Sequence, residues 1–246
     1  MPENVRERIL RESQGQFDPI QVVTVLKSFG SASQPVLVTC SDQESYVIKG
    51  SQNHKMLYNE YVCGRLGNLL DAPVGWLRFV EIPDPLRTGG LGHFGLGFAL
   101  GSFRIPMASE RAGVQYVDVP QNKAGFAALC ILYSWCKAQD HQLLYQEVPP
   151  QLARSCDHGH FFPSGPNWTI DTLKNEPAVV RDTFFDACGL TQNDFAPYWP
   201  KLVAVTDQEI LAICGVGPAE WNVPVAEREA MGQYLIQRRA QVQQAF

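Results

Sequence analysis

One nearly apolar run constrains the fold more than any other segment: residues 124–136, with the sequence AGFAALCILYSWC. Its 13 residues fall short of the ~20 that a helix needs to cross a bilayer. Because the run is apolar on every side, it predicts a helix buried at the centre of a folded domain. We therefore expect a soluble protein with no membrane-spanning segment.

The composition supports a core of that kind and argues against one class of partner. The chain has 246 residues, of which 45% are hydrophobic and 18% charged, enough for one domain or two closely packed lobes. Its 25 acidic residues outnumber its 20 basic ones, which gives a formal net charge of −5. The longest basic run is the pair Arg238 and Arg239, so we expect no nucleic-acid partner.

The cysteines and the N-terminal residues indicate the compartment. The seven cysteines are odd in number, widely spaced and without a C-x-x-C motif, which is typical of reduced thiols. The first eight residues, MPENVRER, are charged and polar, and no apolar stretch of the signal-peptide kind follows them. We therefore expect a cytoplasmic protein.

Two compositional zones are visible along the chain. The first, to about residue 100, contains short β-type runs and one helical pattern at 55–70, and its glycine-rich stretch at 89–101 is expected to be a loop or hinge. The second zone is mainly helical, with loop-like segments at 139–142, 149–150 and 154–162, a capping box of Thr206 and Glu209, and an amphipathic helix at 225–242. Strands are predicted at 21–28, 35–40, 44–49 and 76–82, the first three as a meander.

Lys49 and Glu60 are the first candidate pair for chemistry. Lys49 ends a strand in which Val47 is expected to face away from Tyr46 and Ile48. Glu60 is the only acid of the following helix and lies off its apolar stripe, so the residues alone also allow a solvated lysine and a solvated glutamate. A strand lysine paired with a helix glutamate is the arrangement that holds ATP phosphates in protein kinases.

Asp140 and Asp157 are two acids on loops that follow the buried helix. Phosphoryl transfer requires one carboxylate to orient the attacking hydroxyl and another to hold Mg²⁺ on the nucleotide phosphates. The residues alone equally allow two turn aspartates that bond to the backbone. Cys156 to His160 also allows a zinc site, although structural zinc needs four ligands and no further pair completes a set. The glycine-rich stretch at 89–97 lacks the preceding strand-turn-helix frame of a dinucleotide-binding fingerprint, and no P-loop or serine-hydrolase motif occurs.

In this order, the pieces resemble the HipA-like kinase family, in particular its compact bacterial members. The resemblance runs from about residue 20 to residue 221, and the Asp-His-Gly segment at 157–159 is its most specific piece. The segments that carry it are Gly30-Ser-Ala-Ser, Tyr46-Val-Ile-Lys49, Asn59-Glu60-Tyr, Leu70-Asp-Ala-Pro-Val, Trp135-x4-Asp140, Ser155-Cys-Asp157-His-Gly-His160, Gly165-Pro-Asn-Trp168 and Gly217-Pro-Ala-Glu-Trp221.

The resemblance implies a nucleotide site built from the first zone. Lys49 would contact the ATP phosphates and Glu60 would pair with Lys49. A loop after the first strand would cover the phosphates with its backbone N–H groups. The residues of that loop are Gly30, Ser31, Ala32 and Ser33.

The resemblance also implies a catalytic loop and a metal site in the second zone. Asp140 would be the catalytic-loop aspartate, and Asp157 would bind Mg²⁺. The chain departs from the family pattern here: Ala138 and His141 replace a frequent Asn and Arg, and no Asn follows Asp140 as a second metal ligand. Gln142 is the nearest amide and our candidate for that second ligand.

The implied fold is an α+β, two-lobed, protein-kinase-like fold with a sheet-rich lobe at 1–100 and a helical lobe at 101–246. The implied activity is Mg²⁺-dependent transfer of the ATP γ-phosphoryl to a hydroxyl, on Ser or Thr of a protein. Two alternatives stay open: a nucleotide-binding pseudokinase or regulatory module without turnover, and a different chemistry on this fold, such as a small-molecule kinase or nucleotidylation. Any antitoxin-like partner would be a separate protein.

Overall fold

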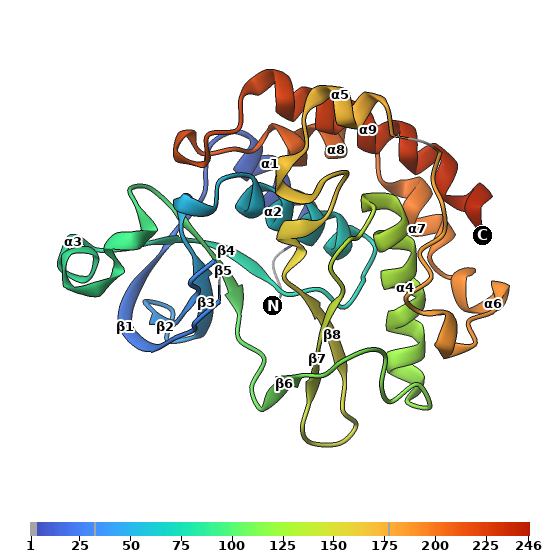
Figure 1. Cartoon of the computed structure of the whole chain (residues 1–246), viewed down its shortest axis with the longest axis horizontal. Helices are drawn as coiled ribbons and strands as arrows, with labels where there is room; N and C mark the ends of the chain where they lie inside the picture. The colour runs from blue at the N-terminus through green and yellow to red at the C-terminus, as the bar shows by residue number, and fades with distance from the viewer. Residues whose placement is uncertain (1–3, 32, 177) are drawn as a thin grey trace.

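The computed structural model describes residues 4–31, 33–176 and 178–246, which form an α+β fold (Figure 1). The strands are β1 (Ile20–Ser28), β2 (Val36–Cys40), β3 (Ser45–Lys49), β4 (Leu77–Glu81), β5 (Ala99–Phe103), β6 (Ala108–Glu110), β7 (Gln142–Gln146) and β8 (Ala153–Cys156). The α-helices are α1 (Val5–Ser13), α2 (Lys55–Leu69), α3 (Asp84–Leu86), α4 (Pro120–Cys136), α5 (Ile170–Lys174), α6 (Gln192–Phe195), α7 (Trp199–Ala204), α8 (Asp207–Gly215) and α9 (Val225–Val242).

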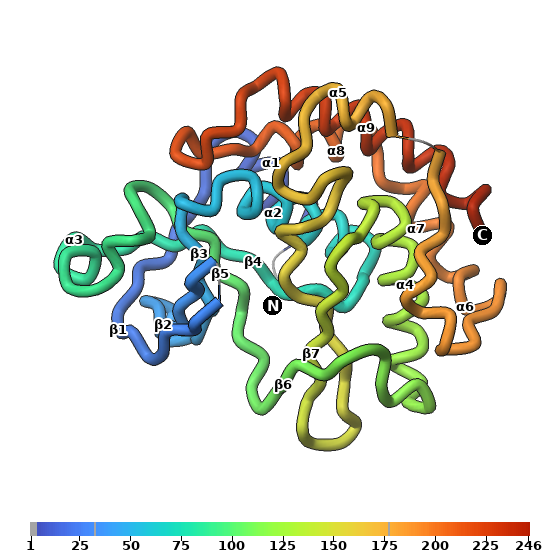
Figure 2. The backbone as a smooth tube through the Cα atoms, in the orientation of Figure 1, coloured from blue at the N-terminus to red at the C-terminus, as the bar shows by residue number. Residues whose placement is uncertain are grey.

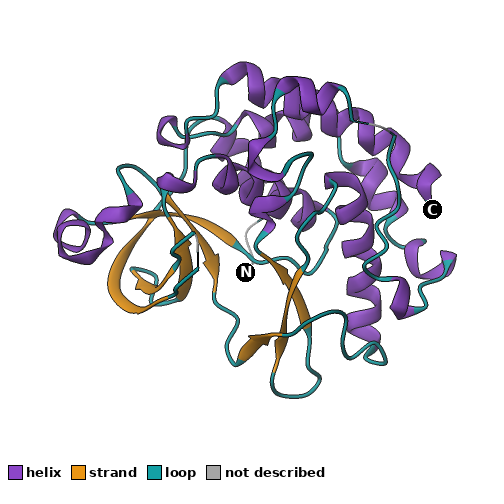
Figure 3. Cartoon of the chain, in the orientation of Figure 1, coloured by secondary structure: helices purple, strands orange, loops and turns teal. Residues whose placement is uncertain are grey.

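The first five strands close into a small barrel in the order β1-β2-β3-β5-β4, at one end of the molecule (Figure 3). Neighbouring strands are antiparallel except for β1 and β4, which pair in parallel only at Ile20 with Val80 and Gln21 with Glu81. The predicted three-stranded meander is therefore confirmed as β1, β2 and β3. A hydrophobic cluster fills the barrel, with Val38 and Ile48 fully buried at its centre.

The rest of the chain packs around the apolar run. It forms α4, whose residues from Phe126 to Cys136 are all buried, so the predicted central helix is confirmed. The helix begins earlier than the run, at Pro120, because proline suits the first helical position, where no N–H is needed. Its last turn is satisfied by the Arg238 guanidinium of α9, which donates to the carbonyl oxygens of Ser134 and Trp135.

A second, larger hydrophobic cluster joins α4 to its neighbouring helices. α4 packs against α2 and α9, α8 packs against α9, and α1 also packs on α8 (Figure 2). Arg6 of α1 pairs with Glu209 of α8. In the described part of the chain, no helix is long and apolar enough to cross a membrane.

Two regions that were predicted to be loops contain strands. Part of the stretch 89–101, expected to be a loop or hinge, is the start of β5, the strand that joins β3 to β4 in the barrel. Gly101 is needed there because a Cβ would lie 2.8 Å from Cγ2 of Val80. The loop-like segments at 139–142 and 154–162 likewise contain the start of β7 and most of β8. These two strands form a hairpin, in which Leu143 and Tyr145 are buried alternately. That hairpin and β6 form a separate three-stranded sheet.

Candidate active site

Lys49 reaches the site because β3 alternates its side chains. Tyr46 and Ile48 point into the barrel core, whereas Val47 and Lys49 lie on the other face and line a cavity. The predicted orientation of this strand is confirmed. The Lys49 ammonium group lies against two carboxylates, those of Glu60 and Asp157, so it is not a solvated strand-end lysine.

Glu60 comes from α2 and is buried, with a side chain only 5% exposed. Its Oε2 lies 3.6 Å from Nζ of Lys49. The backbone N–H of His158 donates to Oε2 at 2.9 Å, and the ring Nδ1 lies 2.9 Å from Oε1. Burial alone would raise the pKa of Glu60, but the proximity of His158 and Lys49 lowers that pKa to about 2. Glu60 is therefore an ionised, fixed partner for Lys49.

Asp157 follows β8 and lines the cavity from the second sheet, whereas Lys49 lines it from the barrel. Its backbone is left-handed, with φ at +56°, and its Oδ1 lies 2.5 Å from Nζ of Lys49. Burial acts to lower the pKa of Lys49, but the charges of Glu60 and Asp157 outweigh it and raise that pKa. The Asp157 side chain is 28% exposed, so it is the more accessible of the two carboxylates.

A buried polar chain supports Glu60 from behind. The hydroxyl of Tyr133 lies 2.6 Å from Oγ of Ser155, which lies 2.7 Å from Nε2 of His158. His158 in turn bonds to Glu60 through Nδ1. The sequence analysis missed Ser155 and Tyr133 as site residues and considered His158 only as a metal ligand. The Asp-His-Gly segment was the one sequence signal for this polar chain. Tyr133 gave none, because a single polar side chain within the apolar helix α4 forms no pattern.

Asp140 and Gln142 lie side by side at the start of β7. Nε2 of Gln142 donates to Oδ2 of Asp140 at 2.9 Å. Gln142 is paired in register with Cys156, the residue before Asp157, and lines the same cavity as Asp157. Asp140 does not itself line that cavity and is joined to it through Gln142.

The loop between β1 and β2 forms part of the rim. Ser31 lines the cavity, Ser33 is buried, and the carbonyl oxygen of Ser33 accepts a hydrogen bond from the Asn53 amide. Gly30 has open space around it, so the backbone is accessible there. Ala32, the remaining predicted loop residue, lies outside the described residues.

The cavity itself has a volume of about 680 Å³ and lies between the barrel and the β6–β8 sheet. Its volume is that of a site for a drug-sized or nucleotide-sized ligand. The apolar side chains of Leu37 and Val47 line it from the barrel, and that of Leu144 lines it from β7. The lining thus combines apolar side chains with the charged groups of Lys49, Glu60 and Asp157.

The zinc interpretation is not supported. Among the residues that the structure describes, no three His, Cys, Asp or Glu side chains gather to hold a metal ion. Both ring nitrogens of His158 already have partners. A Mg²⁺ site of another kind does fit, because Mg²⁺ keeps several waters and needs only one or two carboxylate or amide oxygens. Asp157 and Gln142 supply such oxygens on the cavity wall.

Comparison with solved structures identifies the fold. The chain is similar to CtkA, a proinflammatory kinase of Helicobacter pylori, with 13% identity and a TM-score of 0.59 over 92% of this chain and 96% of that one. Weaker likenesses are to the Golgi casein kinase (11% identity, TM-score 0.48, 98% of this chain and 76% of that one) and to HipA of Shewanella oneidensis MR-1 (13%, 0.41, 99% and 71%). The first of these likenesses shows a kinase-like fold.

Comparison with protein families identifies the relationship. A search of curated proteins found no match. The model of a family described as HipA-like kinase matches residues 22–153, which is more than half of the chain and includes Lys49, Glu60, Asp140 and Gln142. The chain therefore belongs to the HipA-like kinase family.

Proposed function

We propose that this protein is an ATP- and Mg²⁺-dependent kinase that transfers the γ-phosphoryl group of ATP to a Ser or Thr hydroxyl of a protein. One observation carries the proposal: Lys49, Glu60 and Asp157 converge at a 680 Å³ cavity between the barrel and the second sheet. A phosphoryl-transfer site has to supply positive charge and a metal-binding carboxylate at one place, and this cluster supplies both.

Lys49 would bind the α- and β-phosphates. In the structure its ammonium group is bonded to Asp157 at 2.5 Å and is held by buried Glu60 at 3.6 Å. Nucleotide phosphates would take the place of Asp157 as the close partner of Lys49, while Glu60 stays behind it. The loop that contains Gly30 and Ser31 would lie over the same phosphates. The apolar side chains of Leu37, Val47 and Leu144 suit the faces of a nucleobase.

Asp157 and Gln142 would hold Mg²⁺, with waters completing the coordination shell. Bound Mg²⁺ supplies charge neutralisation on the phosphates. Asp140 would accept the proton of the attacking hydroxyl, and the hydrogen bond from Gln142 orients its carboxylate. Asp140 precedes β7 and Asp157 follows β8, so the proposed base and metal ligand flank the same end of this hairpin.

We also propose a two-lobed organisation, with lobes at 1–100 and 101–246. The separate hydrophobic cluster inside the barrel supports a distinct first lobe, and β5 leads through residues 104–107 to the second sheet. We place the protein in the cytoplasm, which suits its seven free cysteines. A separate antitoxin-like protein is the partner that membership of the family suggests.

One observation bears on a pseudokinase as the second candidate. No Asn stands at the spacing after Asp140 where the family has its second metal ligand, and the nearest amide, that of Gln142, donates to Asp140. If that engagement prevents Gln142 from binding the metal, the cavity would hold nucleotide without turnover. The two candidates therefore agree on binding and differ in transfer.

The test combines binding and transfer in the same samples. ATP binding is measured by calorimetry with and without Mg²⁺ on the parent, on Asp157→Ala and on Asp84→Ala, an exposed control aspartate outside the cavity. Transfer of radiolabel from γ-labelled ATP to the protein itself and to a general protein substrate follows. We expect Mg²⁺-dependent binding and transfer in the parent and the control, and loss of transfer in Asp157→Ala. Binding without transfer would favour the pseudokinase, and full transfer by Asp157→Ala would refute the assignment of Asp157.

A further inference from the structure

Asn59 of α2 takes no part in the proposed transfer, yet its side chain is fully buried against the segment at 158–161, which follows Asp157. Its Nδ2 donates to the carbonyl oxygen of Gly159 at 2.8 Å and to that of Phe161 at 3.2 Å. An amide that is buried without partners is costly, so the hydrogen bonds of this side chain are what it contributes there. Asn59 therefore holds two backbone groups of the segment.

Trp168 fixes the orientation of the Asn59 amide. Its indole Nε1–H donates to Oδ1 of Asn59 at 2.8 Å, and since an indole N–H is only a donor, the amide oxygen faces Trp168. The amide nitrogen then faces the two carbonyl groups of the segment. Trp168 is itself fully buried, and the ammonium group of Lys55 lies 4.0 Å from the centre of its ring and donates to its backbone oxygen. The Asn59 side chain thus has one defined orientation.

Two further residues of α2 contact the same segment. The backbone N–H of His158 donates to the Glu60 carboxylate at 2.9 Å. A Cβ on Gly159 would lie 3.2 Å from Cβ of Met56 and 3.4 Å from its carbonyl oxygen, so glycine lets the segment approach the helix closely. With the two bonds from Asn59, the helix fixes three backbone groups of the segment.

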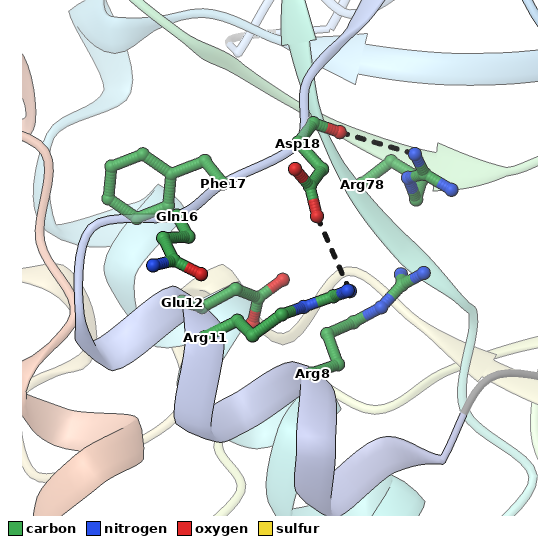
Figure 4. A pocket seen from close by; sticks show the side chains of 7 residues that line it. All are labelled: Arg8, Arg11, Glu12, Gln16, Phe17, Asp18 and Arg78. Carbon is green, nitrogen blue, oxygen red and sulfur yellow. Dashed lines mark hydrogen bonds and ion pairs between the residues drawn. The ribbon is translucent and has the colours of Figure 1, made fainter.

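α2 is a fixed base for these contacts. Near the end of α1, the buried carboxylate of Glu12 (Figure 4) accepts hydrogen bonds from Arg65 and Tyr61 of α2. The hydroxyl of Tyr58 donates to the carbonyl oxygen of Cys214 in α8 at 2.9 Å. Buried hydrogen bonds thus tie α2 to two other helices, and α2 shifts only if these bonds break.

Asp157 lies between two fixed points. Before it, Cys156 is paired with Gln142 in the β7–β8 hairpin, and after it the segment is bound to α2. Its own backbone is left-handed, a conformation that a residue with a Cβ keeps only when its surroundings determine it. Given the proposed role of Asp157 as a metal ligand, on which this inference rests, we propose that Asn59 is a positioning residue for Asp157. Its amide fixes the segment, so the Asp157 carboxylate is held at the cavity before nucleotide and Mg²⁺ bind.

Hydrogen exchange on the full chain, without nucleotide and metal, tests the positioning. The variants are Asn59→Leu, which is similar in size and removes all three contacts, and Trp168→Phe, which removes the indole donor and keeps an aromatic ring. The matched control is Tyr58→Phe, which removes one buried hydrogen bond of the preceding residue on α2 and keeps the ring that packs on Trp168. Urea unfolding of each variant measures the general loss of stability.

The amides of His158, Phe161 and Phe162 report on the segment, because each donates a hydrogen bond in the fold. Their exchange is measured relative to that of amides in the core of α4, which general destabilisation also affects. We expect the Asn59 variant to speed the relative exchange by about tenfold or more, the loss of one or two hydrogen bonds, and the Trp168 variant to do so to a smaller extent. The control variant should leave it unchanged.

Calorimetry of ATP binding over a range of Mg²⁺ concentrations tests the link to the metal. We expect Asn59→Leu to raise the Mg²⁺ concentration for half-maximal ATP binding by about tenfold or more. The metal-free affinity for ATP, which would depend on Lys49, should stay unchanged. General destabilisation lowers the fraction of protein that binds ATP rather than raising the metal requirement, and Tyr58→Phe controls for it.

Two results would overturn the role of Asn59. One is relative exchange of the segment that is as slow in Asn59→Leu as in the parent, and the other is a Mg²⁺ requirement that this variant changes no more than the control does. A parent without Mg²⁺-dependent ATP binding would instead refute the proposed function. The exchange result needs neither ATP nor metal and still decides whether Asn59 fixes the segment, so the two failures are distinguishable.

Discussion

Glu12 and Arg65 form a buried, bidentate ion pair that joins the first helix to the helix carrying Glu60. Two guanidinium nitrogens donate to the two carboxylate oxygens at 2.6 and 2.9 Å, and the side chains are 1% and 5% exposed for Arg65 and Glu12. Tyr61, the residue after Glu60, donates to the same carboxylate at 2.7 Å. This link between α1 and α2 helps to hold the helix that presents Glu60 to Lys49.

Replacing Glu12 by alanine is expected to destabilise the protein by about 3–5 kcal/mol, because it leaves the Arg65 charge buried without a partner. Urea unfolding measures the change. The double variant Glu12→Met with Arg65→Met is the control, and it should recover much of the loss because two apolar side chains need no counter-charge. Equal destabilisation in the single and the double variant would show that packing, not charge, is what the pair provides.

Replacing Lys49 by methionine is expected to weaken ATP binding by about 10- to 100-fold, which corresponds to one charge-assisted hydrogen bond. The substitution also leaves Glu60 and Asp157 without their shared counter-charge. Calorimetry with ATP and Mg²⁺ measures the affinity, and Lys174→Met, at an exposed position at the end of α5, is the matched control. If Lys49→Met and Lys174→Met bind ATP equally well, the phosphate-binding role of Lys49 is wrong.

Replacing Gln142 by alanine is expected to reduce phosphoryl transfer more than ATP binding. The substitution removes a hydrogen bond to Asp140 and one oxygen from the proposed metal site. We expect transfer to fall about tenfold or more and the Mg²⁺ concentration for half-maximal transfer to rise. The control is Gln146→Ala, at the other end of β7. A metal requirement that is the same in both variants would exclude Gln142 as a ligand.

Acid is expected to weaken the fold through Glu60. Its pKa is about 2 in the folded protein against an ordinary value of 4.5, so the unfolded chain binds more protons than the folded one between those two values. The stabilisation by Glu60 is therefore fully present above about pH 4.5 and is lost as the pH falls toward 2. Urea unfolding between pH 3 and pH 6 should show a smaller slope for Glu60→Gln than for the parent. Parallel curves would contradict this origin of acid sensitivity.

Local patterns in the sequence were enough to predict the elements whose pattern lies within one segment of the chain. The alternation around Lys49 and the apolar run of α4 were predicted correctly because each depends only on the period of one element. The family pattern in turn indicated which carboxylates to consider. Lys49, Glu60 and Asp157 do meet in the structure, as the resemblance implied.

The features that were missed depend on contacts between distant segments. β5 is hidden by its glycine, since Gly101 lowers the strand signal while its missing side chain makes room for Val80. The helical period of α2 put Glu60 outside its apolar stripe, which left a solvated glutamate possible. In the structure Glu60 turns toward His158, a contact that the period of one helix cannot reveal. Tyr133 lies within an apolar helix, and its role becomes visible only when Ser155 is brought beside it.

The closure of the barrel has a consequence for local opening of the chain. β1 pairs with β4 at only two positions, Ile20 and Gln21, and within the described residues its remaining length is bonded to β2 alone. The side chains of Val23, Val25 and Leu26 are exposed, so little apolar surface resists separation of this part of β1. We therefore expect the amides of residues 23–28 to exchange with deuterium through sub-global opening, ahead of those in the core of α4. Gly30 and Ser31 follow directly on this part of β1, so its separation from β2 would displace them without any loosening of the helical core.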